Sequence, residues 1–186
     1  MILYFFVFFY IESFYERRDS MDIIIRNVRK DDIISVADIK VKGWQSAYRG
    51  IISDDYLDSM DIEKNISKMY RNYNSNGFIV AVVNNEVVGF CRYIFDCDSP
   101  YLGELSALYV RPDLKGMGIG TKLFDYVVNE FKKCGKTKMI LWCLKDNYKS
   151  RKFYSNKGGK IIGEKSFYLN DVLYTDVCFS FDLKEG

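Results

Sequence analysis

The sequence predicts an α/β fold of the α+β kind, with one mostly antiparallel sheet of about seven strands and about four helices. Three observations predict it. The chain has 186 residues, of which 48% are hydrophobic, and this is enough for one substantial core. Segments with the two-residue period of a strand are interspersed with segments that have the period of a helix. Turns at 84–85 and 170–171 begin with asparagine and join strand-like segments, which indicates two antiparallel hairpins.

The first twenty residues differ from the rest of the chain. The run MILYFFVFFYI is apolar, has no basic residue before it and no small-residue cleavage site after it, and is too short to span a bilayer. Met21 opens the first segment with a globular pattern. We therefore expect residues 1–20 to be an apolar extension that is not native or is disordered, and residues 21–186 to form a single domain. A membrane-surface anchor and an added edge strand are the competing interpretations.

Two helices are predicted between the first strand and the first hairpin. Residues 22–28 form the strand, and Asp31 or Asp32 then caps a helix with apolar residues at helical spacing. A loop that contains GWQSAYRGI follows, and Ser53 begins the second helix. The segments FIVAVV and EVVGFCRYIF are the two strands of the first hairpin.

The second half of the chain alternates strands and helices before it ends in the second hairpin. GELSALYV (103–110) is a strand, and a glycine-rich segment leads from it into a helix whose apolar face includes Leu123 and Phe131. KMILWCL (138–144) has the composition of a buried strand. Residues 147–157 form a short helix, and the segments KIIGEKSFYL and LYTDVCFSFDL close the chain as an antiparallel pair.

Composition excludes several classes of function. The 27 basic and 25 acidic side chains nearly balance, so no strong field favours nucleic acid or an anionic membrane as a partner. The five cysteines form no CxxC pair, which fits reduced thiols in the cytoplasm better than a disulfide framework. Histidine is absent, which excludes Ser-His-Asp and Cys-His catalysis and every histidine-based zinc site. We expect no metal.

The segment LKGMGIGTKL carries three glycines at alternate positions, 116, 118 and 120. Its lysine follows the threonine, so the segment does not match the P-loop, GxxxxGK[ST]. A Rossmann GxGxxG would stand early in a series of strands and helices, whereas this GxGxG lies about two-thirds of the way along. A strand end, unpaired N–H groups and a helix N-terminus remain, and together they predict an anion site. A tight turn without ligand is the alternative.

Two motifs together resemble the GNAT superfamily of N-acetyltransferases. LYVRPDLKGMGIGTKL matches the coenzyme A loop [Q/R]xxGx[G/A] through Lys115, Gly118 and Gly120, and LWCLKDNYKSRKFYSNKGG matches the later Asn…[A/S]RxFYxxxG segment. The order of predicted elements from Met21 onward is also similar to that of the family. The sequence departs from the pattern at Lys115, which replaces Gln or Arg, and at Gly159, where an aromatic residue often stands.

The resemblance implies a GNAT-like fold, with a splayed pair of parallel strands at 104–110 and 138–144, and acetyl-CoA as cosubstrate. It implies that backbone amides of the glycine loop bind the pyrophosphate, that the preceding strand pairs with the pantetheine arm, and that one face of the 147–157 helix closes the site. The implied cofactor-binding residues are Leu108, Tyr109, Val110, Lys115, Gly116, Met117, Gly118, Ile119, Gly120, Thr121, Asn147, Ser150 and Arg151.

The implied reaction is direct attack of a primary amine on acetyl-CoA in a ternary complex. Tyr154 is assigned as the acid for the departing thiolate, since a tyrosine is protonated at neutral pH. Glu104 is the candidate base, and the Val110 N–H is a candidate donor to the thioester carbonyl oxygen. The alternatives are that Tyr154 only packs beside Phe153, and that Glu104 forms a strand-end ion pair.

The acceptor site is expected in residues 43–57. Trp44 and Tyr48 could stack on the acceptor, and Asp54 or Asp55 could hold a second ammonium; core packing and helix capping are the alternatives. The expected acceptor is a small-molecule amine or a peptide N-terminus. We expect no nucleic acid and no stable membrane association, and a homodimer is compatible with these observations. The competing function is a non-catalytic acyl-CoA-binding sensor.

Overall fold

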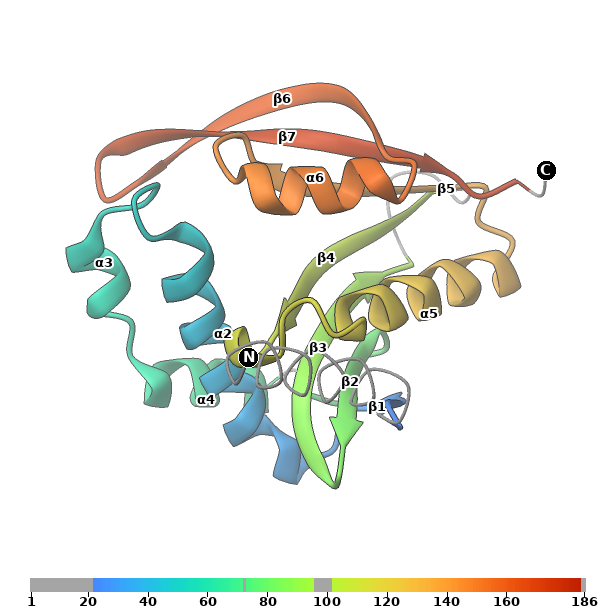
Figure 1. Cartoon of the computed structure of the whole chain (residues 1–186), viewed down its shortest axis with the longest axis horizontal. Coiled ribbons are helices and arrows are strands. Elements are labelled where there is room, and N and C mark those ends of the chain that lie inside the picture. Colours follow the sequence, from blue (N-terminus) through green and yellow to red (C-terminus); the bar gives the residue numbers. More distant parts are fainter. Residues whose placement is uncertain (1–21, 72, 96–101, 185–186) are drawn as a thin grey trace, which may run out of the picture.

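A seven-stranded sheet organises the computed structural model, which describes residues 22–71, 73–95 and 102–184 (Figure 1). The strand order is β1-β2-β3-β4-β5-β7-β6. Strands β4 and β5 are parallel, and the other neighbouring pairs are antiparallel. The predicted fold class is therefore confirmed. The extension predicted at 1–20 lies outside the described residues.

Five α-helices and two 3-10 turns accompany the seven strands among these residues. In chain order the elements are β1 (Ile24–Asn27), η1 (Lys30–Asp32), α2 (Ile33–Tyr48), α3 (Asp54–Asp58), α4 (Ile62–Tyr70), β2 (Phe78–Val83), β3 (Glu86–Ile94), β4 (Leu102–Val110), η2 (Pro112–Leu114), α5 (Ile119–Lys133), β5 (Lys138–Leu144), α6 (Tyr148–Asn156), β6 (Lys160–Leu169) and β7 (Val172–Asp182). No helix in the described part of the chain is long and apolar enough to cross a membrane.

The helices before β2 differ from the prediction in two ways. Helix α2 continues to Tyr48, through residues predicted as loop. The second predicted helix is divided into α3 and α4. The division follows from a local signal, because the Asp61 side chain accepts a hydrogen bond from Lys64 N at 3.1 Å and so begins a new helix.

Asp32 precedes α2, as predicted, but its side chain does not cap that helix. The carboxylate instead accepts hydrogen bonds from both terminal nitrogens of Arg26, at 2.6 and 2.9 Å, and from Arg29 N at 2.6 Å. The reason is that the chain passes through η1 first, which turns the carboxylate back toward β1. Burial opposes this charge, but the hydrogen bonds and the Arg26 charge hold the pKa of Asp32 below its usual value.

Both predicted hairpin turns are present. Asn84 and Asn85 have φ of 49° and 65°, and Asn170 and Asp171 have φ of 47° and 60°. Positive φ at both central residues is the pattern of a two-residue type I′ turn. The local sequence therefore sets the register of β2 with β3 and of β6 with β7.

Helices cover both faces of the sheet. Helix α5 buries Leu123, Val127 and Phe131 against one face, and Phe153 and Tyr154 of α6 pack on the same core. Helices α2 and α4 cover the other face of β2 and β3. Both faces of the sheet are thus buried in its first half.

The parallel pairing of β4 with β5 is short. It joins Leu102 to Lys138 and ends at Glu104 and Ile140. Beyond that point β4 stays paired with β3 as far as Val110, and β5 stays paired with β7 as far as Leu144. The two strands therefore separate in the middle of the sheet, which confirms the predicted splay.

The space around Gly103 shows how closely α5 packs on β4. A Cβ atom at Gly103 would lie 2.6 Å from ring carbons of Phe131, whose ring is also edge-on to Tyr93 and Phe95. We expect Gly103→Ala to lower the free energy of unfolding, measured in urea, by about 1–3 kcal/mol through overpacking.

Gly163→Ala is the control, because nothing lies within 4 Å of a Cβ atom there. The cost of Gly103→Ala should shrink in a Phe131→Leu background, where the ring is gone. An equal cost in both backgrounds would contradict the contact.

Candidate active site

A cleft of about 950 Å³ lies where β4 and β5 separate. Residues from α2, β4, the loop before α5, the first turn of α5, β5 and α6 line it. Tyr48 reaches it from the α2 side of the sheet and Tyr154 from the α6 side. The cleft is therefore accessible to side chains from both faces of the sheet. We call it the central cleft.

Most of the residues predicted for the site line the central cleft. They are Leu108, Tyr109, Val110, residues 115–121, Asn147, Ser150, Tyr154 and Tyr48. Glu104, Arg151 and Trp44 are outside the lining. Glu104 is half-buried in the last parallel pair, and Trp44 packs against Tyr48 and Tyr56 with ring centroids 5.0 and 6.5 Å apart.

The glycine loop presents bare backbone at the start of α5. Gly116 and Gly118 have φ of +82°, a conformation that favours glycine, and nothing lies within 4 Å of a Cβ atom at either position. Gly118 is the N-cap, so the N–H groups of the first helical turn have no intrahelical acceptor. Two loop amides are engaged by long bonds: Lys115 N to Pro112 O at 3.5 Å and Met117 N to Leu114 O at 3.4 Å. The first turn of α5 is the stronger set of anion donors.

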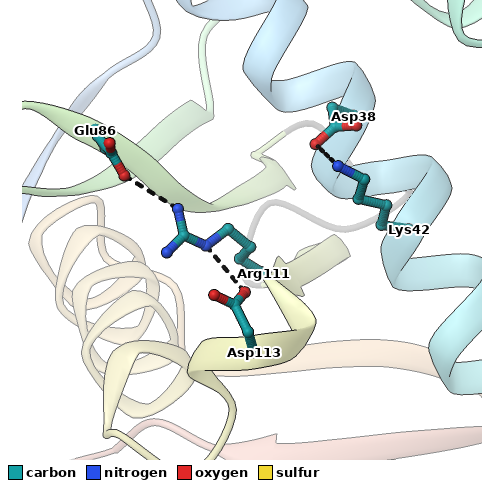
Figure 2. A network of polar contacts seen from close by, with 5 residues as sticks. All are labelled: Asp38, Lys42, Glu86, Arg111 and Asp113. Carbon is teal, nitrogen blue, oxygen red and sulfur yellow. Dashed lines mark hydrogen bonds and ion pairs between the residues drawn. The ribbon is translucent and has the colours of Figure 1, made fainter.

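Arg111 holds the turn between β4 and this loop (Figure 2). Its Nη1 donates to Glu86 Oε2 at 3.1 Å and its Nε to Asp113 Oδ1 at 2.9 Å. On the neighbouring α2, Lys42 Nζ donates to Asp38 Oδ2 at 2.9 Å. These pairs are exposed and so stabilise the fold little, but the two made by Arg111 join the end of β4 to β3 and to the turn that follows.

Two lysines face the central cleft near the loop. Lys115 Nζ donates to Ser46 Oγ of α2 at 3.1 Å, and Lys149 lines the cleft from α6. Desolvation lowers the pKa of Lys115 below its usual value, and the charge of Lys149 lowers it further. Two like charges near the N-terminus of α5 make this end of the cleft attractive to an anion. The sequence prediction missed Lys149, which stands just before the Ser150 of the recognised motif.

Helix α6 begins at a buried asparagine. Asn147 Oδ1 accepts the hydrogen bond of Ser150 N at 3.1 Å, which caps the helix and accounts for the burial of Asn147. Arg151 turns away from the cleft: its Nη1 donates to Lys145 O at 2.7 Å, and its guanidinium lies 5.5 Å from the centre of the Tyr148 ring. Asn147, Ser150 and Tyr154 are on the cleft side, at helical spacing.

Three tyrosines of the cleft keep their protons. Burial raises the pKa values of Tyr48, Tyr109 and Tyr154 above the usual value near 10, most strongly those of Tyr48 and Tyr154. For Tyr154 the neighbouring Cys143 and Tyr109 add to this effect. The Tyr154 ring is fixed by Phe153 and Phe179, with centroids 5.3 and 5.8 Å away. Its hydroxyl is therefore a protonated donor in a constant position.

Strand β5 contributes two side chains that the sequence prediction took only as buried strand. Trp142 and Cys143 both line the cleft. Burial raises the pKa of Cys143 to about 12, with a smaller contribution from Asp176. After Lys138 the run KMILWCL has no charged residue that would indicate a site, so only the separation of β4 from β5 reveals the position of Trp142 and Cys143.

Comparison with known proteins agrees with this geometry. The Acetyltransferase (GNAT) family model matches residues 41–159. An uncharacterised N-acetyltransferase of Archaeoglobus fulgidus is 30% identical over 141 residues, which cover 72% of this chain and 90% of the relative. The chain belongs to the GNAT acetyltransferase family. The resemblance predicted from the two sequence motifs is confirmed.

More distant GNAT proteins share the fold. A PaiA N-acetyltransferase from Thermoplasma acidophilum, solved in complex with coenzyme A, matches with a TM-score of 0.72 and 23% identity over 87% of this chain and 99% of its own. The YncA structure from Salmonella typhimurium, solved with acetyl-CoA, matches with a TM-score of 0.64 and 19% identity over 88% and 95%. The spermidine N(1)-acetyltransferase of Thermoplasma acidophilum is 24% identical over 148 residues, 76% of this chain and 90% of its own.

The two lysines give a prediction that needs no ligand. Lys149→Gln removes the like charge, so the pKa of Lys115 should rise toward its usual value while desolvation still holds it below. NMR titration of the lysine side chains measures the shift. Lys152→Gln, an exposed lysine of α6, is the matched control and should leave the pKa of Lys115 unchanged. No change with Lys149→Gln would mean that the two ammonium groups do not interact.

Proposed function

We propose that the protein transfers the acetyl group of acetyl-CoA to a primary amine by direct attack within a ternary complex. The observation that carries this proposal is the central cleft, which is lined from both faces of the sheet at the point where β4 and β5 separate. Two substrates can approach one point there from opposite sides. Family membership supports the reaction class, and the solved relatives that hold coenzyme A or acetyl-CoA support the cosubstrate.

The residues present fit coenzyme A. The first turn of α5, Lys115 and Lys149 would bind the pyrophosphate. The open edge of β4 would pair with the pantetheine amides. Arg111 N donates to Val88 O of β3 at 2.9 Å, so the backbone groups of the preceding Val110 point the other way, into the cleft. By the same alternation, the backbone N–H and C=O groups of Leu108 point toward the cleft and those of Tyr109 point toward β3.

Bound acetyl-CoA supplies an activated acetyl thioester. The Val110 N–H donates to the carbonyl oxygen of this thioester and stabilises the charge that develops there. Tyr154 donates its proton to the sulfur as the carbon–sulfur bond breaks. Glu104 lies outside the cleft lining and six residues before Val110 on β4, roughly 20 Å away at about 3.3 Å per residue, so the proton that the amine loses would reach it through a chain of waters. One proton leaves nitrogen and one reaches sulfur, so the step balances.

Cys143 favours direct attack over an acyl-enzyme. It is the cysteine that lines the cleft among the described residues, and its pKa of about 12 leaves it protonated at neutral pH. A protonated thiol is a poor nucleophile. The four described cysteines, Cys91, Cys134, Cys143 and Cys178, are all unpaired, which supports a cytoplasmic location for the protein.

Acetyl-CoA should raise the melting temperature. At a hundredfold excess over Kd the folded state gains about 2.7 kcal/mol. Gly118→Asp should remove this shift, because its carboxylate would stand at the N-terminus of α5 and repel the pyrophosphate. Differential scanning fluorimetry measures both. The absence of a shift in the wild type would contradict the cosubstrate assignment.

The matched control is Gly135→Asp, just beyond the other end of α5. Gly135 has φ of +72° and, like Gly118, nothing within 4 Å of a Cβ atom. The two variants therefore share the added charge and the backbone strain, but only Gly118 lines the cleft. Equal loss of the ligand-induced shift in both would place the pyrophosphate elsewhere.

Tyr154→Phe should lower kcat by about 10²- to 10⁴-fold with little change in the affinity for acetyl-CoA, since only the proton donor is lost. Steady-state thiol release with an amine acceptor measures it. Tyr126→Phe is the control: Tyr126 of α5 packs on the same core but lies outside the cleft lining, so the loss of its hydroxyl should leave kcat unchanged. Equal losses in the two variants would reduce Tyr154 to a packing residue. The absence of thiol release with every amine tested, beside intact acetyl-CoA binding, would favour the non-catalytic sensor.

A further inference from the structure

One group of side chains beside the central cleft has no role in the reaction described above. It lies on the sheet face opposite α5. In the sheet register Trp142 is opposite Cys178, Leu144 is opposite Asp176, and Asp176 is opposite Lys165 of β6. Directly paired residues, and alternate residues of one strand, share a face of the sheet. Trp142, Asp176 and Lys165 are therefore neighbours on one surface, and Trp142 also lines the cleft.

An ammonium group already binds to this surface. Lys165 Nζ lies 3.9 Å from the centre of a Trp142 ring, well within the range of a cation–π contact. Lys165 makes no ion pair within the residues that the structure describes. The indole face thus binds the end of a four-carbon aliphatic amine that the chain itself supplies.

Asp176 is a carboxylate without a close partner. It is half-buried, and among the described residues it accepts no hydrogen bond and forms no ion pair. Burial raises its pKa, and the charge of Lys165 opposes this effect. A shielded, unpaired carboxylate is unfavourable unless a cation approaches it. By contrast Asp54, predicted from the sequence to hold a second ammonium, is paired with Arg49 at 3.3 Å, and Arg49 also pairs with Asp58 at 2.6 Å.

We propose that Trp142 and Asp176 form a subsite for a second ammonium group of the acceptor, and that Lys165 occupies this subsite until the acceptor displaces it. The proposal rests on the proposed function and names the substrate class: a linear aliphatic diamine. The residue spacing along β5 gives the expected distance between the two nitrogen atoms of the diamine. From Ile140, where the parallel pairing ends, to Trp142, whose ring binds the ammonium group, is two residues, roughly 7 Å at about 3.3 Å per residue, a span that a five-carbon diamine covers.

Apolar side chains lie close to this path. Leu144 packs in one cluster with Trp44, Tyr48 and Tyr56. Such a surface suits the methylene groups between two amines, because burial of each methylene contributes about 0.8 kcal/mol. Trp44 and Tyr48, expected from the sequence to stack on the acceptor, would thus contact its chain and leave its charged end to Asp176.

The test compares two acceptors of equal carbon chain, cadaverine and pentylamine, at saturating acetyl-CoA. Wild type should show a kcat/KM at least about tenfold higher for cadaverine, which corresponds to about 1.4 kcal/mol. Asp176→Asn should raise KM for cadaverine by about tenfold and leave KM for pentylamine unchanged. Lys165→Met should lower KM for cadaverine because the competing ammonium is gone. Equal kcat/KM for the two amines in wild type, or equal effects of Asp176→Asn on both, would overturn the proposal.

Glu164→Gln is the matched control for charge. Glu164 is adjacent to Lys165 on the other face of β6 and pairs with Lys145 at 2.9 Å, so this variant should keep the preference for cadaverine. Loss of the preference for cadaverine in Glu164→Gln would show that net charge alone causes this preference, and it would overturn the proposal.

A binding measurement separates the two levels of inference. Cadaverine, but not pentylamine, should raise the melting temperature of the coenzyme A-bound protein, and Asp176→Asn should abolish the difference. This difference would support the subsite even if neither amine led to thiol release. The absence of thiol release would contradict only the proposed reaction. Thiol release with pentylamine and no added stabilisation by cadaverine would keep the reaction and overturn the subsite.

Discussion

The end of the parallel pairing at Glu104 and Ile140 is the constraint on which the site depends. Beyond this pair, β4 remains bonded to β3 and β5 to β7, so each strand has one satisfied edge and one open edge. Open backbone groups inside a sheet are unfavourable unless water or a ligand satisfies them. The separation therefore creates both the central cleft and its capacity to bind a peptide-like arm, before any side chain contributes.

Aromatic packing around the cleft holds the candidate functional groups of α5 and α6 in fixed positions. Phe124 of α5 lies against Phe153 and Phe181, and Tyr154 packs with tilted rings between Phe124 and Phe179 of β7. Because α5 and α6 share this core, the helix that presents the anion donors and the helix that presents the hydroxyl are held relative to each other. Burial of Tyr154 in this core also raises its pKa, so the same packing positions the donor and keeps its proton.

Local signals explain what the sequence could predict. The asparagine turns, the glycine loop and the helix that follows Asn147 are each encoded within a few residues, and the structure has them where they were expected; the cap formed by the Asn147 side chain was not predicted. Register explains most of what was missed. Asp176 becomes a neighbour of Trp142 only because β7 pairs between β5 and β6, an arrangement that no local pattern records. The extension of α2 to Tyr48 was missed for a related reason, since tertiary packing of Trp44 stabilises a helical turn that its local sequence does not favour.

The two ends of the cleft differ in charge, and this difference orients the proposed substrates. Lys115, Lys149 and the N-terminus of α5 make one end cationic. Glu104 and Asp176 lie on the sheet face opposite α5. The charge of Glu104 contributes to the raised pKa of Cys178, which is two residues from Asp176 in β7. An anionic cosubstrate and a cationic acceptor would each be repelled from the end that suits the other. Each proposed substrate would therefore favour its own side, and we propose that the two meet where β4 and β5 separate.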